Sequence, residues 1–384
     1  MPPMRGIPLP IRTEDFTADP VELFFDLAYV FAFSQLVGLL IHDPTWGGVG
    51  EAALLFALLW LPWQQLTWAA NAVSGNGRAV RTIFLAATVL SIPMAASTSS
   101  ALEGGGGVFA VALTGIMLLG FGIQILAARG EPGFFKAAMT WILPNLVAIA
   151  LLLAGAASHG STRVILWLMT VAVVFGAMVL AGSGEWIIRS GHFAERHGLI
   201  IIIALGEVIV AIGVPVVASL ETDSGIPGNT LAALVASGVF ACLLWWGYFD
   251  RVSPSLEHRV ASIEGDNKRG RYVRDVYTWA HAPMVAGIIM AAAALEEITL
   301  HPDAIVPTAF LAMMAGGLGL IAVGVTAAVW RAYRLIAWER VIGAAAVVTL
   351  VWLGSGLEGV VLLTLIVVAI ALAFYIEHLR VEPT

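Results

Sequence analysis

The chain has 384 residues, of which 59% are hydrophobic and 12% are charged, whereas a soluble domain carries roughly 25% charged residues. Apolar runs of about 20 residues recur along its whole length, each long enough to cross a hydrocarbon layer roughly 30 Å thick. This composition excludes a soluble globular domain, argues against nucleic acid as a partner, and predicts that the lipid bilayer surrounds most of the chain. The net charge of -7 adds little, because acids and bases are expected on opposite sides of the membrane. The single cysteine, Cys242, excludes an intrachain disulfide.

The hydropathy pattern predicts an all-α, polytopic membrane helix bundle of about twelve transmembrane helices. Residues 1–20 contain no apolar stretch of the kind that a cleavable signal peptide needs, so the first helix is expected to act as an uncleaved targeting signal. The last two helices are separated by little more than Gly354-Ser355-Gly356, which allows either a tight hairpin or one broken helix. The predicted helices span residues 21–42, 50–73, 79–98, 106–128, 137–157, 163–181, 197–218, 229–249, 272–293, 304–328, 335–354 and 356–376.

The basic residues test this helix count independently, because cytoplasmic loops retain lysine and arginine. One set of segments, both termini and every second loop, holds 18 of the 19 basic residues, and the other set holds only Arg163. A missed or invented helix would break this alternation. We therefore predict an even number of spans in a bacterial inner membrane, with both termini in the cytoplasm. The 18 residues are Arg5, Arg12, Arg78, Arg81, Arg129, Lys136, Arg189, Arg196, Arg251, Arg259, Lys268, Arg269, Arg271, Arg274, Arg331, Arg334, Arg340 and Arg380.

The two halves of the chain share short matches about 190 residues apart. Arg78-Ala-Val-Arg81 is matched by Arg271-Tyr-Val-Arg274, and each segment is followed by a Pro-Met pair. Likewise Leu58-Leu59-Trp60 is matched by Leu243-Leu244-Trp245. These matches predict a duplicated six-helix unit whose copies are parallel, with halves at 1–194 and 195–384. The alternative is that tryptophan and arginine recur at any membrane interface. Repeats of this kind occur in secondary transporters, whose sites lie between the halves.

Glu207 is the deepest acid in the predicted bundle. It lies about ten residues from the start of the helix 197–218, hence roughly 15 Å into the membrane at helical rise. An ionised carboxylate there costs about 2.5–3.5 kcal/mol, so we expect it to be neutral, paired or facing water. Ala204 and Ala211 share its face and allow another helix to approach closely. It has either a proton- or cation-coupled role or a packing role as a protonated side chain bonded between helices.

Glu22 and Asp26 are one turn apart on the first predicted helix and share a face with Tyr29. Two acids this close repel each other unless a base or a cation lies between them. The pair is therefore predicted to form either a binding site or a structural salt bridge. The candidate bases at the same level are Arg81, Arg196 and Arg274.

Two further groups of polar residues are candidates for solute or ion binding. Gln64 and Asn71 lie on one stripe of the second predicted helix, which either lines a cavity or bonds to neighbouring helices. His281 lies four residues after Tyr277 and just before Pro283, a position that fits a packing residue or a ligand.

Several catalytic signatures are absent from the sequence. It has no phosphate-binding glycine loop followed by Lys-Ser or Lys-Thr, no His-Glu-x-x-His and no Gly-x-Ser-x-Gly. We assign no catalytic residue, no metal ligand and no cofactor, and an enzyme is the less favoured class.

Two segments resemble the bacterial low temperature requirement protein A (LtrA) family. They are Val-Glu-Leu-Phe-Phe-Asp-Leu-Ala-Tyr-Val-Phe-Ala at 21–32, and Glu-Arg-His-Gly-Leu at 195–199 running on to Ala-Leu-Gly-Glu at 204–207. The chain departs from the family pattern at Ala28-Tyr29 and at His197, where Phe is commoner. The resemblance implies a multi-pass bacterial membrane protein and favours four residues in the matching motifs. They are Glu22, Asp26, Arg196 and Glu207.

The leading hypothesis is a secondary transporter or permease for a small solute, with a site between the first and seventh helices. Glu207 would be its proton- or cation-sensitive group, and Glu22 and Asp26 with Arg196 would form a cytoplasmic gate. The first alternative is a membrane-embedded enzyme acting on a lipid-linked substrate. The second is a sensor or assembly factor that uses the charged loop 250–271 to hold a partner; that loop also fits a linker between bundles.

Overall fold

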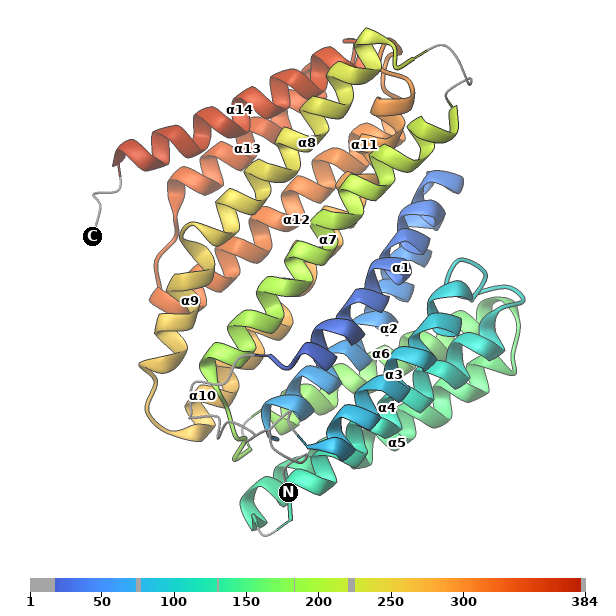
Figure 1. Ribbon diagram of the computed structural model, residues 1–384, viewed down its shortest axis with the longest axis vertical. Coiled ribbons are helices and arrows are strands. Elements are labelled where there is room, and N and C mark those ends of the chain that lie inside the picture. Colours follow the sequence, from blue (N-terminus) through green and yellow to red (C-terminus); the bar gives the residue numbers. More distant parts are fainter. Residues whose placement is uncertain (1–17, 74–76, 130, 183, 220–224, 381–384) are drawn as a thin grey trace, which may run out of the picture.

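The computed structural model describes residues 18–73, 77–129, 131–182, 184–219 and 225–380, and these form helices joined by short turns (Figure 1). Arg5 and Arg12 of the basic set lie outside the described residues. The predicted all-α class is confirmed. The helices are α1 (Pro20–His42), α2 (Trp46–Asn71), α3 (Arg78–Ala96), α4 (Gly106–Ala127), α5 (Pro132–Ala156), α6 (Gly160–Ala181), α7 (Ser190–Ser219), α8 (Gly228–Phe249), α9 (Val252–Ala261), α10 (Asp266–Val273), η1 (Arg274–Trp279), α11 (His281–Leu300), α12 (Thr308–Tyr333), α13 (Trp338–Leu353) and α14 (Gly359–Arg380).

The twelve long helices match the twelve that the sequence predicts. Eleven helical segments of the described chain are long and apolar enough to cross a membrane, as a multi-pass membrane protein requires. The exception is α13, which has 16 residues and is only about 24 Å long at helical rise. It forms a hairpin with α14, so the last pair is two helices and not one broken helix.

Several boundaries differ from the sequence prediction, among them the end of the ninth predicted helix, which lies at Leu300 and not at residue 293. Helix α7 begins at Ser190, seven residues before the predicted start, because the polar segment before His197 continues the helix. The predicted loop 250–271 contains two short helices, α9 and most of α10. Val252, Leu256 and Val260 of α9 are buried, because their spacing of four places them on one face, which packs against the bundle.

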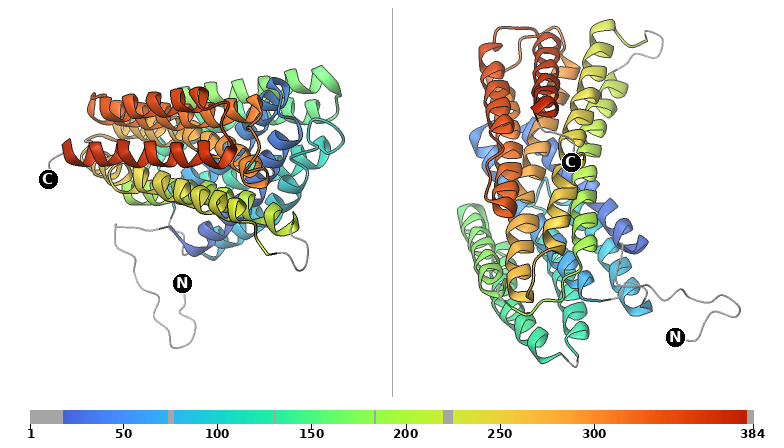
Figure 2. Two further views of the ribbon diagram at one scale, coloured as in Figure 1. Left: turned by 90° about the horizontal axis from the view of Figure 1, so that it is seen from above. Right: turned by 90° about the vertical axis from the view of Figure 1, so that its left-hand side faces the viewer.

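The two halves share several neighbour pairs, although α2 packs on α4 whereas α8 makes no comparable contact with α12. Helix α1 packs on α3 as α7 packs on α11, α5 pairs with α6 as α13 pairs with α14, and α2 contacts α6 as α8 contacts α14. The halves meet where α1 lies against α7 and α11 (Figure 1). The long helices run roughly along one direction in both other views (Figure 2). The division at residues 194 and 195 stays a prediction.

Arg163, the exception to the charge alternation, lies at the end of the bundle where α4 and α6 begin, which we call the acidic end. Its guanidinium donates to backbone carbonyls at the end of α5 and in the turn between α3 and α4. The side chain is buried, and those carbonyls satisfy it, because the end of a helix leaves carbonyls without helical partners. The acceptors are the carbonyls of Gly155 at 3.3 Å, Ala156 at 3.4 Å, Ser158 at 2.7 Å, Ala101 at 3.0 Å and Glu103.

Candidate functional site

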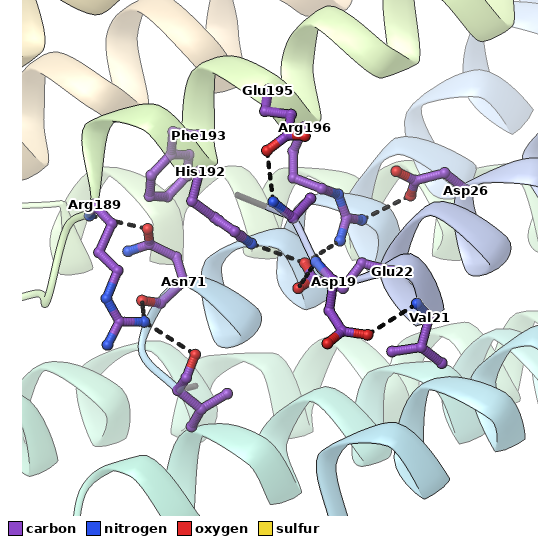
Figure 3. A network of polar contacts seen from close by, with 12 residues as sticks. Asp19, Val21, Glu22, Asp26, Asn71, Arg189, His192, Phe193, Glu195 and Arg196 are labelled. Carbon is purple, nitrogen blue, oxygen red and sulfur yellow. Dashed lines mark hydrogen bonds and ion pairs between the residues drawn. The ribbon is translucent and has the colours of Figure 1, made fainter. Parts of the chain in front are cut away.

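A buried group of charges joins α1 to α7 at the opposite end of the bundle, where α1, α3 and α7 begin and which we call the basic end (Figure 3). Arg196 Nη1 is 2.5 Å from Glu22 Oε2, and its Nη2 is 2.7 Å from Asp26 Oδ1. His192 Nε2 is 2.8 Å from the same Glu22 oxygen. Each of these four side chains is at most 1% exposed. We call Glu22, Asp26, His192 and Arg196 the ion network.

Helix geometry explains why these residues meet. Glu22 and Asp26 are separated by four residues on α1, and His192 and Arg196 by four on α7, so each pair occupies one face. The start of α1 is fixed by a capping box: Asp19 accepts from the backbone N–H of Val21 at 3.1 Å, and Glu22 Oε1 accepts from that of Asp19 at 3.2 Å. Glu22 therefore uses one oxygen for the helix cap and the other for the ion network.

The chain before α1 is also tied to neighbouring helices. The backbone N–H of Ala18 donates to Glu195 Oε2 of α7 at 2.5 Å. Arg81 of α3 contacts Asp19 at 3.1 Å. Both contacts hold the beginning of α1 against α3 and α7.

Aromatic side chains of α2 and α3 pack against the ion network. Trp63 Nε1 donates to Asp26 Oδ1 at 2.8 Å. The Arg196 guanidinium carbon lies 5.7 Å from the Trp63 ring centre and 5.9 Å from that of Phe84, distances at which cations are attracted to aromatic rings. Asp26 Oδ2 and Arg196 Nε have no hydrogen-bond partner among the described residues.

Gln64 belongs to a second buried group, in which the donors and acceptors follow one order. Trp68 Nε1 donates to Thr278 Oγ1 at 3.2 Å, and the Thr278 hydroxyl donates to Gln64 Oε1 at 2.9 Å. Gln64 Nε2 then lies 3.1 Å from His197 Nε2, and His197 Nδ1 lies 2.9 Å from the carbonyl of Phe193. Because a carbonyl only accepts, Nδ1 carries the hydrogen and Nε2 accepts from Gln64, which makes His197 neutral in this arrangement. Gln64 therefore bonds two neighbouring helices.

His281 is held in the same way. Its Nδ1 lies 2.9 Å from the carbonyl of Val276, and its Nε2 lies 2.7 Å from the Tyr248 hydroxyl. The ring stacks on Tyr277 with centroids 5.3 Å apart, and its centroid is 5.1 Å from that of His197. Both ring nitrogens are used within the protein, as the packing interpretation expects.

Asn71 ends α2 and holds the segment that leads into α7. Its side chain donates to the carbonyl of Ile187 and accepts from the backbone N–H of Arg189 at 3.0 Å. Arg189 in turn donates to the carbonyls of Asn71 at 2.9 Å and Val73 at 3.0 Å (Figure 3). Burial lowers the pKa of Arg189, and the nearby Glu22 carboxylate opposes that shift. Asn71 thus positions the start of α7.

Glu207 lies farther along the same α1–α7 contact and is 2% exposed. Its Oε2 is 2.5 Å from Ser34 Oγ, which also lies 3.2 Å from the carbonyl of Val30. A hydroxyl has one hydrogen. If Ser34 donates it to Val30, a protonated Glu207 donates to Ser34; if Ser34 donates to Glu207, the carboxyl oxygen accepts, as it can in either protonation state. Either state gives Glu207 a polar partner between the two helices.

The family described as Bacterial low temperature requirement A protein (LtrA) matches residues 17–374. The chain belongs to the LtrA family. An uncharacterized protein of Rhizobium meliloti (strain 1021) is 29% identical over 301 residues, which cover 76% of this chain and 72% of that protein. No solved structure matches.

The LtrA match includes both motif segments, and the structure brings three of the four motif residues into one site. Glu22, Asp26 and Arg196 meet in the ion network, whereas Glu207 lies apart with Ser34. Gln64, Asn71 and His281 lie outside the ion network. The roles of all seven candidates in binding stay predictions.

Two residues that contact the predicted acids of this LtrA chain were missed from sequence. His192 was placed outside the seventh helix, although its spacing of four from Arg196 is the signal that would have found it once the helix is extended. Trp63, three residues after the repeated Leu-Leu-Trp segment, was not among the predicted site residues. Among the described residues, no group of three or more His, Cys, Asp or Glu side chains is arranged to hold a metal ion.

Proposed function

We propose that this LtrA-family protein is a secondary transporter whose two halves move relative to each other as the ion network gains and loses a proton. The observation that carries the proposal is the charge balance of the network. Two carboxylates, Glu22 and Asp26, face one guanidinium, that of Arg196. Burying an unbalanced charge is costly, so neutrality requires one proton, either on His192 or on one of the acids.

The charged groups around the network do not remove this imbalance. Including them gives four carboxylates against three guanidinium groups, again one positive charge short. A proton on His192 balances the wider set as well. The carboxylates are Asp19, Glu22, Asp26 and Glu195, and the guanidinium groups are Arg81, Arg189 and Arg196.

The position of the network supports a role in movement. Its acids are on α1 of the first half, and its bases are on α7 of the second, so sliding or tilting one helix against the other must break Arg196 contacts. Adding or removing a proton changes the net charge of the network. It therefore changes how much buried charge is left unpaired when α1 and α7 separate, and so the energy of that separation. A proton can shift the equilibrium between two arrangements of the halves only if it binds one arrangement more tightly than the other.

The proposal refines the expected roles of the candidate residues. The network at the basic end supplies the proton-sensitive group, and Glu207 supplies a contact between helices. The excess of Lys and Arg at the basic end supports a cytoplasmic location for that end in a bacterial inner membrane. The transported molecule is a small solute.

The test does not require the solute to be known. If the two halves rock against each other, the distance between them at the basic end and the distance at the acidic end change in opposite directions. All cysteine substitutions are made in a Cys242→Ser background. One protein carries spin labels on cysteines that replace Lys136 and Glu257 near the basic end. A second protein carries them on cysteines that replace Glu103 and His301 near the acidic end. These positions are exposed. Distances are measured in proteoliposomes by pulsed electron paramagnetic resonance between about pH 6 and 8. We expect one distance to lengthen and the other to shorten by several ångströms.

Replacing His192 by Asn keeps a polar side chain but removes its basic group, and we expect it to abolish the pH response. Thr82→Ala, which removes an exposed hydroxyl of α3 that donates to the carbonyl of Arg78 at 2.9 Å, is the comparison variant and should keep the response. Distances that do not change with pH in the wild-type protein would show that the network is a fixed connection and would contradict the proposal.

A further inference from the structure

A cavity lies between helices of the first half and η1, away from the ion network. It has a volume of about 30 Å³ and is lined by residues of α2, α4, α5, α6 and η1. A cavity of roughly 10–15 Å³ by this kind of measure holds one water molecule, so this one is larger than a single water. Its main lining residues are Gln65, Gln124, Trp68, Trp141, Trp186 and Arg274.

Two buried amide atoms at this cavity have no partner among the described residues: Gln65 Nε2 and Gln124 Oε1. Both side chains are 1% exposed. The orientation of the Gln65 amide is fixed, because Trp141 Nε1 is only a donor and lies 2.8 Å from Gln65 Oε1. The NH₂ group of Gln65 must therefore point away from Trp141. An unpaired buried donor or acceptor is costly, so a matching group is expected in the cavity.

The other polar groups around the cavity are already used. Trp68 Nε1 donates to Thr278, and Trp186 Nε1 donates to the carbonyl of Ala181 at 2.7 Å. The guanidinium of Arg274 is bound by Asp275, with contacts of 2.9 and 2.6 Å. The three tryptophans thus present aromatic carbon to the cavity, and the charge at its edge is paired.

We infer that this cavity is a binding site for a small, uncharged, planar molecule that carries both a hydrogen-bond acceptor and a donor, of the primary carboxamide class. Its carbonyl accepts from Gln65 Nε2, and its NH₂ group donates to Gln124 Oε1. The amide contacts the indole rings that line the cavity, where a charged group would lose its hydration without a counterion. The site is separate from the proposed proton-sensitive network and does not depend on that proposal.

Gly120 keeps the cavity open. A Cβ atom at this position would lie 2.6 Å from Gln65 Cγ and 3.2 Å from Gln65 Nε2, so an alanine here pushes the Gln65 side chain out of place. Gly122, two residues along the same helix, has nothing within 4 Å of its Cβ position. The two glycines therefore provide a matched pair of substitutions.

The experiment uses acetamide as the probe and the full chain in lipid nanodiscs. Binding is followed by saturation-transfer difference NMR on the acetamide methyl group. We expect a saturable signal with a dissociation constant of roughly millimolar size, since a ligand of four heavy atoms has little binding energy available. Gly120→Ala and Gln124→Met should each weaken binding at least about tenfold, the loss expected for one hydrogen bond to an otherwise unpaired buried group. Gly122→Ala should leave it unchanged.

Two other small molecules test the chemistry of the site. N,N-dimethylacetamide lacks the donor, and acetate replaces the amide by a charge; both should fail to compete. The inference is overturned if the wild-type protein gives no saturable acetamide signal, which would leave water as the occupant. It is also overturned if dimethylacetamide competes equally, or if Gln124→Met, folded by size-exclusion chromatography, binds as the wild type does.

Discussion

Two buried arginines lie at opposite ends of the bundle, and their surroundings differ in kind. Arg163 at the acidic end is surrounded by backbone carbonyls, which have no charge to gain or lose. Arg196 at the basic end is bound by two carboxylates and lies next to a histidine that shares one of them. The carbonyls hold Arg163 identically at any physiological pH. The surroundings of Arg196 can take up a proton, and that is why we place the moving part of the protein there.

The surroundings of Arg163 also explain why this arginine breaks the charge alternation. The carbonyls of Gly155 and Ala156 lie in the last turn of α5, where the helix dipole is negative. A cation placed there is favoured whichever side of the membrane it faces. Arg163 is therefore interpreted as a structural connection between the end of α5 and the turn before α4.

The largest expected effect comes from removing the charge of Arg196. Arg196→Met leaves Glu22 and Asp26 buried without a cation, which should destabilise the protein by about 4 kcal/mol. Adding Glu22→Gln and Asp26→Asn removes the uncompensated charges and should recover most of that loss. Unfolding free energies measured by steric trapping in bicelles give both values. A single variant as stable as the wild type would mean that Arg196 is not the cation of this site.

Helical periodicity predicts which residues of one helix share a face, and this limits how much of the site the sequence could predict. Spacing places Glu22 and Asp26 on one face, and the motif singles out Arg196; both were predicted. Periodicity does not say which face of a distant helix lies opposite, so the partner of Glu207, Ser34, could not be named.

The same limit applies to the groups that join distant segments. His192 required the correct start of α7, which lies in a polar segment that hydropathy does not mark as helix. The carbonyls around Arg163 come from two turns separated by about 50 residues of sequence, and no spacing rule connects them. Helix number and class were predicted because burial in lipid requires long apolar runs.

A smaller effect is expected from Gly106, which forms part of the Arg163 surroundings. A Cβ at this position would lie 2.7 Å from the carbonyl oxygen of Ala101 and 2.8 Å from Arg163 Nη1. Because backbone must shift to make room, Gly106→Ala should cost about 2 kcal/mol. Gly107→Ala is the control, since nothing lies within 4 Å of its Cβ position, and replacing a helical glycine there should stabilise by up to about 1 kcal/mol.

Thermal unfolding in nanodiscs distinguishes the two glycine variants. Equal melting temperatures would mean that Gly106 has room for a side chain and that the Arg163 surroundings are looser than the structure shows. A loss in Gly106→Ala that is the same at about pH 6 and pH 8 would support a connection that does not respond to protons.

The smallest effect is expected at Glu207, which lies between the two arginines along the bundle. Gln has the same shape, and its NH₂ group can donate to Ser34, so Glu207→Gln should change the unfolding free energy by less than about 1 kcal/mol. Because the ion network is untouched, the pH-dependent change in the two spin-label distances should also persist. A variant that folds normally but no longer responds to pH would assign the proton-sensitive step to Glu207, and Arg196 would then resemble Arg163 in being only structural.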